Sequence, residues 1–143
     1  MPKKRSSRKP ENKTIPELIK RLDKSFAKLV KISASEDGMY VCCYTCGKSM
    51  TLGQATTQAG HFISRSYSPT RYDPNNVKPQ CAHCNDKRYG NGKPLEFEHN
   101  LRSELGDTII DNMKKKARAH HKWDRFWLIA RIEDVEERLK GMA

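Results

Sequence analysis

Four cysteines occur in two pairs with the spacing of metal ligands, Cys43-x-x-Cys46 and Cys81-x-x-Cys84. A Cys-x-x-Cys turn places two thiolates about one edge of a tetrahedron apart, and two such turns complete the closed four-sulfur shell of a structural zinc ion. We therefore expect a bound Zn²⁺ that closes a loop of the 34 residues between the pairs. A redox role is the alternative, but neither pair lies in a βαβ pattern.

The fifth cysteine, Cys42, directly precedes the first pair. It could replace Cys43 as a ligand, although the two-residue spacing favours Cys43. Because successive side chains of a strand point to opposite faces, we expect Cys42 to face away from the metal as a small core residue. Cysteines used as metal ligands rather than in disulfides indicate a reducing compartment such as the cytoplasm.

A histidine and two asparagines accompany the cysteine pairs. His61 lies between the pairs, Asn76 lies five residues before Cys81, and Asn85 directly follows Cys84. If zinc holds a hairpin and a following helix together, His61 would lie beside Asn85 in a ββα-metal arrangement. There a histidine activates water as a general base, and a divalent ion, Mg²⁺ or Mn²⁺, stabilises charge on the phosphate. The alternative for any single histidine, His61 included, is a structural role.

The elements that position these residues are predicted from apolar spacing and from breakers. Thr14 and Glu17 form a capping box at the start of an amphipathic helix. The strands should be short, because polar and breaker residues interrupt them. We expect helices at 14–32, 81–89, 94–106, 107–116 and 123–140, strands at 39–43, 55–64 and 76–80, and a polar loop at 65–75.

The chain is strongly basic, with a net charge of +11 and a pI near 9.6. Residues 1–13 and 114–125 each carry a net charge of +5. This balance favours a polyanionic partner, most simply nucleic acid, although each run could also be a solvated tail or helix face. We expect no membrane contact, because the sequence has neither a signal-peptide core nor about 18 consecutive apolar residues.

Several short motifs, taken in order, resemble one known family. They resemble the HNH nucleases of the His-Asn-Asn type and, more closely, the phage NinG/Rap recombination nucleases, over about residues 40–140. The resemblance implies an α+β fold with a small zinc-stapled ββα-metal core, flanking helices, and cutting of branched DNA such as Holliday junctions and D-loops. The motifs are Cys46-Gly47, Ala59-Gly60-His61-Phe62, Arg71-Tyr72-Asp73-Pro74-Asn75-Asn76, Gln80-Cys81, Cys84-Asn85 and Gly90-Asn91.

The sequence divides into four expected regions, of which the nuclease core is named from the resemblance. We expect a disordered basic arm at 1–13 and an N-terminal amphipathic helix at 14–35. A zinc-stapled HNH-like nuclease core follows at 36–93, and a C-terminal helical region at 94–143. A phage-encoded protein of this kind would act in the cytoplasm of its host.

The resemblance assigns His61 as the base, Asn76 as the residue that braces the hairpin loop, and Asn85 as the residue on the metal side. Many HNH enzymes carry an acid directly before the histidine, where this chain has Gly60. Asp73 is our first substitute for that acid, and Gln58 is a weaker one. Asp73 could equally form an Asx turn before Pro74. His61 could itself bind the catalytic ion, in which case another residue would be the base.

Basic residues flank the expected site, and we expect them to contact phosphates rather than bases. Arg65, four residues after His61, is the candidate for stabilising the transition state; a structural salt bridge is the alternative. The predicted DNA-binding residues are Lys3, Lys4, Arg5, Arg8, Lys9, Arg65, Arg71, Lys78, Lys87, Arg88, Lys114, Lys115, Lys116, Arg118 and Lys122.

We therefore predict a metal-dependent endonuclease that is selective for branched DNA. The alternatives are a non-catalytic zinc protein that assists recombination and an HNH nuclease that acts on ordinary duplex DNA. Two symmetric cuts at a junction would suit a homodimer. Leu128, Ile132, Val135 and Leu139 form an apolar stripe on the last helix; this stripe could be a dimer seam, although an intramolecular core is the more common role.

Overall fold

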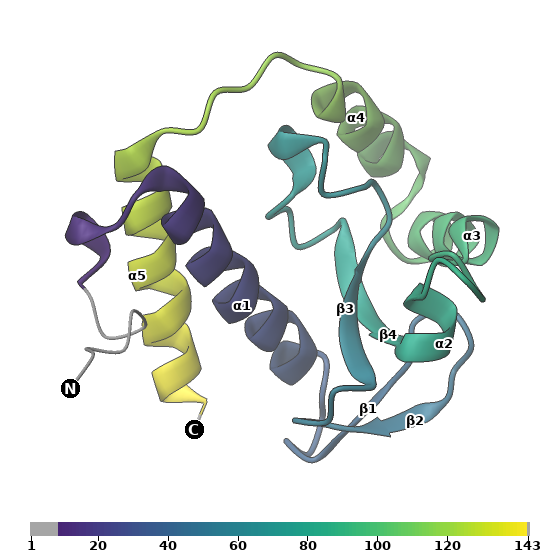
Figure 1. Cartoon of the computed structure of the whole chain (residues 1–143). Coiled ribbons are helices and arrows are strands. Elements are labelled where there is room, and N and C mark those ends of the chain that lie inside the picture. The colour runs from purple at the N-terminus through teal and green to yellow at the C-terminus, as the bar shows by residue number, and fades with distance from the viewer. Residues whose placement is uncertain (1–8, 143) are drawn as a thin grey trace. The chain divides into compact units, whose positions relative to one another are not determined.

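The computed structural model describes residues 9–142 and has a mixed α+β architecture, as predicted (Figure 1). No described helix is both long enough and apolar enough to cross a membrane. The elements are η2 (Pro10–Asn12), α1 (Ile15–Ser33), β1 (Tyr40–Cys42), β2 (Ser49–Thr51), β3 (Thr57–His61), η3 (Ser68–Thr70), β4 (Val77–Cys81), α2 (Ala82–Asn85), α3 (Pro94–Leu105), α4 (Asp107–Ala117) and α5 (Arg125–Gly141).

The described residues fall into two compact units. The helical unit consists of the described residues up to Phe26 together with those from Lys122 onward. The strand unit consists of residues 27–121 and contains all four strands, α2, α3 and α4.

In the helical unit, α1 begins with the predicted capping box. The Thr14 hydroxyl accepts a hydrogen bond from the Glu17 N–H at 3.3 Å, and the Glu17 carboxylate accepts one from the Thr14 N–H at 3.5 Å. These reciprocal bonds satisfy donors that a helix start leaves without partners. Leu18 and Leu22 follow at helical spacing and are completely buried.

The last helix, α5, lies beside the first part of α1 (Figure 1). Leu128, Ile132 and Val135 of α5 are completely buried within this chain, so the stripe that they form is intramolecular core. Arg21 of α1 makes a two-pronged ion pair with Glu136 of α5, with N–O distances of 2.8 and 2.7 Å. A homodimer stays a prediction, but these three side chains are not available as its seam.

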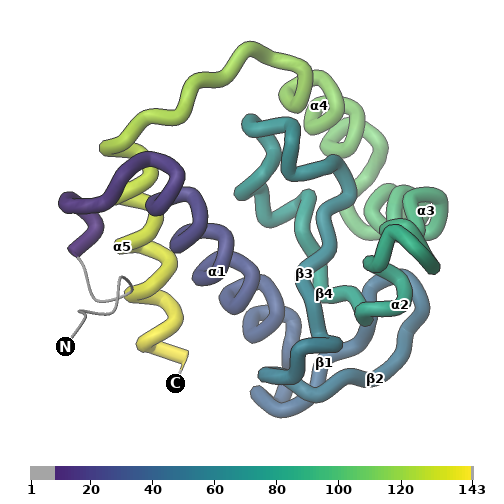
Figure 2. Tube along the Cα trace, in the orientation of Figure 1, coloured from purple at the N-terminus to yellow at the C-terminus, as the bar shows by residue number. Residues whose placement is uncertain are grey.

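The strand unit contains two antiparallel ribbons (Figure 2). β1 pairs with β2, with Val41 opposite Met50. β3 pairs with β4 in a register that places Thr57 opposite Cys81 and His61 opposite Val77. The strands predicted at 39–43 and 76–80 are confirmed to within a residue at each end. The strand predicted at 55–64 is half as long as expected, and β2 was not predicted.

The helix predicted at 81–89 is wrong in length, because α2 ends at Asn85. Asp86 has extended backbone angles, and its carboxylate accepts a hydrogen bond from the Arg88 N–H at 2.8 Å, as in a turn. The chain then folds back on α2, and a Cβ atom at Gly90 would lie 2.4 Å from the Cys84 carbonyl oxygen. Only glycine allows this close approach.

Helices α3 and α4 pack together over a small core of Phe97, Leu101, Ile110 and Met113. An ion-pair network also joins them, because Arg102 contacts Glu98, Asp107 and Asp111 at 2.8–3.0 Å. Asp107 is the first helical residue of α4, and its carboxylate pairs with Arg102.

Candidate functional site

The four predicted zinc ligands come together in the strand unit. Cys43 and Cys46 lie in the turn between β1 and β2, Cys81 ends β4, and Cys84 lies in α2. Their sulfur atoms all lie within 4.8 Å of one another, and the Cys46 and Cys81 sulfurs are 3.9 Å apart. A tetrahedral shell with Zn–S bonds of about 2.3 Å has sulfur–sulfur edges of about 3.8 Å. This thiol cluster can therefore hold a metal ion such as zinc.

Hydrogen bonds and burial around the thiol cluster shift the pKa values of its thiols, which affects how the cluster binds a cation. The Cys43 sulfur accepts a hydrogen bond from the Cys81 N–H at 3.3 Å, and the Cys81 sulfur accepts one from the Cys84 N–H at 3.4 Å. Burial raises the pKa of the Cys43 thiol, but hydrogen bonds from Thr45, Cys81 and Cys46 outweigh it and lower this pKa to about 6. Burial raises the pKa of Cys84 to about 12, so metal binding there must displace a proton.

Cys42 does not belong to the thiol cluster. It faces away from the metal position, as strand alternation requires, but it is exposed. The expectation that it is a core residue is wrong, because β1 and β2 form a two-stranded ribbon that buries only the face with Val41 and Met50.

His61 is the last residue of β3, and its ring is held by the loop that follows. Its Nε2 atom lies 3.0 Å from the backbone carbonyl oxygen of Arg71. A carbonyl oxygen can only accept a hydrogen bond, so Nε2 is the donor and carries the proton. In the neutral ring this assignment leaves the lone pair on Nδ1, which is the nitrogen that can act as a base.

Asn76 is completely buried and clamps the same loop. Its side-chain oxygen accepts from the Ile63 N–H at 2.7 Å, and its amide group donates to the carbonyls of Ile63 and Thr70 at 3.0 and 3.1 Å. The start and the middle of the loop are thus tied to one side chain at its end. Because Thr70 precedes Arg71, this clamp also fixes the carbonyl group that binds His61.

Asn85 contacts β3 at a different place. Its amide nitrogen donates to the side-chain oxygen of Gln58 at 2.9 Å. Gln58 and His61 are three residues apart in β3, so their side chains leave the strand on opposite faces. Asn85 thus contacts β3 through Gln58, on the face that strand alternation assigns opposite to His61. The expected meeting of His61 and Asn85 around one ion stays a prediction.

Asp73, the predicted substitute acid, forms the Asx turn that was the alternative. Its carboxylate accepts a hydrogen bond from the Asn75 N–H at 2.9 Å. Within residues 9–142, the thiol cluster is the one group of three or more His, Cys, Asp or Glu side chains close enough to share a metal. The predicted site for Mg²⁺ or Mn²⁺, with Asp73, His61 and Asn85, stays a prediction.

Gln80 is a central residue that the sequence analysis missed. It is completely buried, and its amide nitrogen donates to the Thr45 hydroxyl at 3.0 Å and to the Gly92 carbonyl at 2.9 Å. Its side-chain oxygen is buried without a hydrogen-bond partner and would lie 1.9 Å from a Cβ atom at Gly60. Gln80 thus fills the place into which an acid at position 60 would project. A glycine inside a strand is the signal that could have indicated this close approach.

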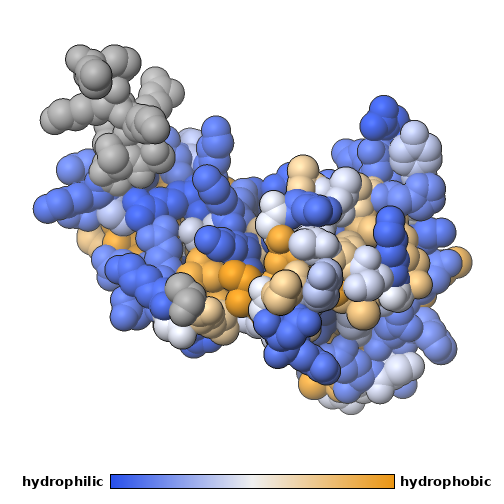
Figure 3. Space-filling model, turned by 90° about the horizontal axis from the view of Figure 1, so that it is seen from below, coloured by the Kyte–Doolittle hydropathy of each residue, from blue (hydrophilic) through white to orange (hydrophobic). Residues whose placement is uncertain are grey.

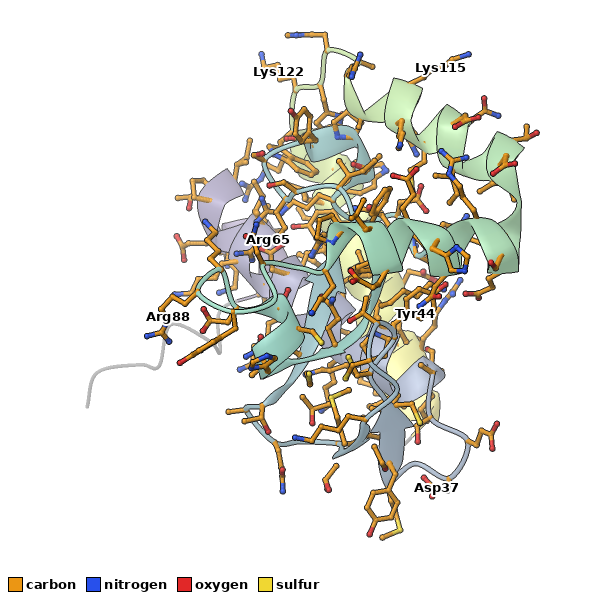
Figure 4. The ribbon with its side chains drawn as sticks, turned by 90° about the vertical axis from the view of Figure 1, so that its right-hand side faces the viewer. Asp37, Tyr44, Arg65, Arg88, Lys115 and Lys122 are labelled. Atoms are coloured by element: carbon orange, nitrogen blue, oxygen red, sulfur yellow. The ribbon has the colours of Figure 1, made fainter. Side chains whose placement is uncertain are left out.

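The predicted phosphate contacts differ in how exposed they are. Lys78, Lys114 and Arg88 form ion pairs within the strand unit, with Glu104 at 3.4 Å, Glu98 at 3.0 Å and Asp86 at 3.1 Å. Arg88 and Lys115 extend away from the ribbon (Figure 4). Hydrophilic residues cover most of the face shown in Figure 3. Lys9, Arg65, Lys87, Lys116, Arg118 and Lys122 are also exposed, and Arg71 is half-buried, whereas Lys3, Lys4, Arg5 and Arg8 lie outside the described residues.

Comparison with known proteins gives one consistent family. The family model described as "Bacteriophage Lambda NinG protein" matches residues 2–143. Protein ninG of Escherichia phage lambda is 32% identical over 101 residues, which are 70% of this chain and 47% of that protein. Protein ninG of Escherichia phage 933W is 32% identical over 82 residues, 57% of this chain and 38% of that protein. The chain thus spans less than half the length of these relatives, and no solved structure matches it.

Proposed function

The chain belongs to the NinG family of bacteriophage proteins, and from this premise we propose that it is a zinc-stapled endonuclease that cuts branched DNA. Holliday junctions and D-loops are the substrates that we propose. The printed name of the relatives states no activity, so the support comes from the residues of the site. The net charge of +11 suits a DNA partner.

The observation that carries the proposal is the setting of His61. The Arg71 carbonyl fixes the ring from its Nε2 side, and Asn76 holds the loop that presents this carbonyl. In the proposed reaction Nδ1 takes a proton from water while the water oxygen bonds to the phosphorus. The bond from phosphorus to one sugar oxygen breaks, and this leaving oxygen takes a proton from solvent. His61 is the catalytic residue in this scheme, and Asn76 is a positioning residue.

Positive charge is needed where negative charge grows on the phosphate. Arg65 is exposed on the loop directly after His61 and is our candidate for this role. Mg²⁺ or Mn²⁺ is the proposed catalytic ion, although the described side chains do not form a prepared carboxylate site for it. We therefore assign no step to the ion, and its requirement is part of the test.

The thiol cluster has a structural role in this proposal. Its four sulfurs join the β1–β2 turn, the end of β4 and the start of α2. A closed four-sulfur shell leaves no open position for water or substrate. A bound zinc ion would therefore hold the ribbons that carry His61 without taking part in the reaction.

The test compares cutting of a four-way junction with cutting of a matched linear duplex, in Mg²⁺, in Mn²⁺ and without added ion. We expect ion-dependent cutting of the junction, and a loss of about 10²–10⁴-fold in rate for His61→Ala, the range for a general base. His99→Ala is the matched control, because His99 is exposed on α3. Zinc content, measured on each variant, shows that the thiol cluster is intact.

The outcomes separate the proposal from its two alternatives. Equal rates on junction and duplex would favour a nuclease for ordinary duplex DNA. An absence of cutting with every ion would favour a non-catalytic protein that binds DNA during recombination. Full activity of His61→Ala would remove His61 from the base role.

A further inference from the structure

Three aromatic side chains lie where α5 begins; Phe126 and Trp127 are exposed, and Trp123 is half-buried. Phe126 is 81% exposed and Trp127 is 45% exposed. The Trp123 and Trp127 rings lie 6.0 Å apart, with an angle of 40° between their planes. Leu128 is the first residue of α5 that is buried. Phe126 therefore contributes little to the packing of the helical unit. Large aromatic side chains this exposed are typical of binding surfaces.

The surroundings of this aromatic cluster are basic. Lys122 is exposed and extends away from the chain (Figure 4), and Arg125 donates a hydrogen bond to the Glu11 carbonyl. The neighbouring acid, Asp124, accepts hydrogen bonds from the N–H groups of Phe126 and Trp127 at 2.7 and 3.1 Å. The N–H groups at the helix start are therefore already occupied by Asp124. Lys122 and Arg125 are the groups that would contact a phosphate.

We propose that Trp123, Phe126 and Trp127, together with Lys122 and Arg125, form a surface that binds single-stranded DNA by stacking on its unpaired bases. Aromatic rings stack on any base, and neighbouring cations follow the phosphate backbone. A second copy of the chain is the other possible occupant. It would bring a further net charge of +11 toward a basic surface, so charge complementarity favours the polyanion.

This inference deepens the proposed function, since branched DNA can expose unpaired bases at its branch point. It does not depend on His61, so the two can fail separately. A protein that binds single strands here but never cuts would refute the nuclease alone. A nuclease that does not use this surface would refute the inference alone.

Intrinsic fluorescence tests the inference directly, because the only two tryptophans of the chain are Trp123 and Trp127. The protein used is the His61→Ala variant, which we expect not to cut, titrated with an oligothymidine of about 15 nucleotides, near the upper site size of a single-strand-binding fold. A blunt duplex of equal charge is the comparison. We expect quenching of tryptophan emission by the single strand and little quenching by the duplex.

Phe126→Ala and Phe126→Leu are the decisive variants, each made in the His61→Ala background. Both should weaken single-strand binding about tenfold, which corresponds to the loss of one base stack, and both should change duplex binding less than twofold. Leu95→Ala is the matched control, since Leu95 is 82% exposed in the strand unit, and it should change neither. Lys122→Ala should weaken both and lower the salt dependence by about one phosphate contact.

Three results would overturn the inference. The first is unchanged single-strand affinity in both Phe126 variants. The second is an equal loss of affinity for the single strand and the duplex. The third is self-association in sedimentation that Phe126→Ala abolishes, which would assign the surface to a second copy.

Discussion

The helical unit and the strand unit are held together in different ways. In the helical unit the interior consists of long aliphatic side chains such as Leu18, Leu22 and Ile132, all completely buried. In the strand unit the cluster around the first ribbon contains Val41 and Met50 together with three of the cysteines. A two-stranded ribbon is marginally stable by itself in water. The ribbons therefore need cross-links, whereas the helical unit and the α3–α4 part of the strand unit rely on apolar burial.

This difference bears on where the proposed chemistry lies. His61 and Asn76 both belong to the strand unit, and polar contacts rather than apolar packing fix their positions. Side-chain clamps and a metal staple hold a few atoms in defined places even when little apolar area is buried. His61 and Asn76 thus lie in the unit where side-chain hydrogen bonds fix positions that apolar packing alone would not fix.

The largest predicted effect is the loss of the metal. Structural zinc sites in zinc-finger peptides contribute about 10–16 kcal/mol, which matches or exceeds the whole stability of a typical domain, about 5–15 kcal/mol. Chelation, or Cys84→Ser, should therefore unfold the strand unit. All five tyrosines lie between residues 40 and 89, and both tryptophans lie in the helical unit. Tyrosine near-UV dichroism should collapse, while tryptophan emission should change much less.

Cys42→Ser is the matched control for metal loss, because Cys42 is exposed and lies outside the thiol cluster. It should leave zinc content and both optical signals unchanged. Full tyrosine dichroism in a zinc-free protein would contradict the contrast between the two units.

The second prediction concerns the apolar core of the helical unit. Ile132→Ala should lower the free energy of unfolding by about 2–5 kcal/mol, the range for a large aliphatic side chain deleted from a core. Zinc content should not change, since Ile132 lies outside the strand unit. Ile109→Ala is the control, because Ile109 is 43% exposed. Urea unfolding measures both, with tryptophan emission for Ile132→Ala and tyrosine dichroism for Ile109→Ala; equal effects of the two variants would contradict the prediction.

Many elements of both units could be predicted from the sequence, because the signals for them depend on residues close together in the chain. The capping box at Thr14 and Glu17, the spacing of Leu18 and Leu22, and the cysteine pairs each depend on residues a few positions apart. β2 could not be predicted, since Ser49–Thr51 is three residues long and only Met50 is buried. α2 ends early because of the turn at Asp86 and the close approach at Gly90, which involve contacts between backbone segments.

In the candidate site, too, contacts between distant segments could not be predicted from the sequence. The positions of His61 and Asn76 followed from motif order, and the clamp that joins them to one loop agrees with the expected bracing role. The partner of Asn85 and the role of Gln80 depend on the register of β3 and β4, which aligns Gln58 with Gln80. Sequence spacing alone does not give that register.

The third prediction tests the close approach of Gly60 and Gln80, which the register of β3 and β4 creates. Gly60→Ala places a Cβ atom 1.9 Å from the Gln80 side-chain oxygen, and two hydrogen bonds hold that amide in place. The substitution should destabilise the protein by about 1–3 kcal/mol, as overpacking does. In a Gln80→Ala background the same substitution should cost much less. A double-mutant cycle from urea unfolding measures the coupling, and strictly additive effects would exclude the contact.

The smallest predicted effect is that of the ion pair between Arg21 and Glu136 in the helical unit. Their side chains are 27% and 32% exposed, so Glu136→Gln should cost no more than about 1 kcal/mol. The hydrogen bond from Arg21 lowers the pKa of Glu136 below its ordinary value. The stabilisation is therefore complete above the unfolded-state pKa of about 4.3 and is lost as the pH falls through the lower folded-state pKa.

The pH dependence separates this ion pair from a purely steric effect of the substitution. The difference in unfolding free energy between the parent protein and Glu136→Gln should be constant near neutral pH and should shrink at pH values below about 4. Glu133→Gln is the matched control on the same helix, because Glu133 is exposed, and it should show no such difference. A difference that persists unchanged in strong acid would mean that Glu136 contributes through packing. The helical unit would then depend even more completely on burial than its contrast with the strand unit already indicates.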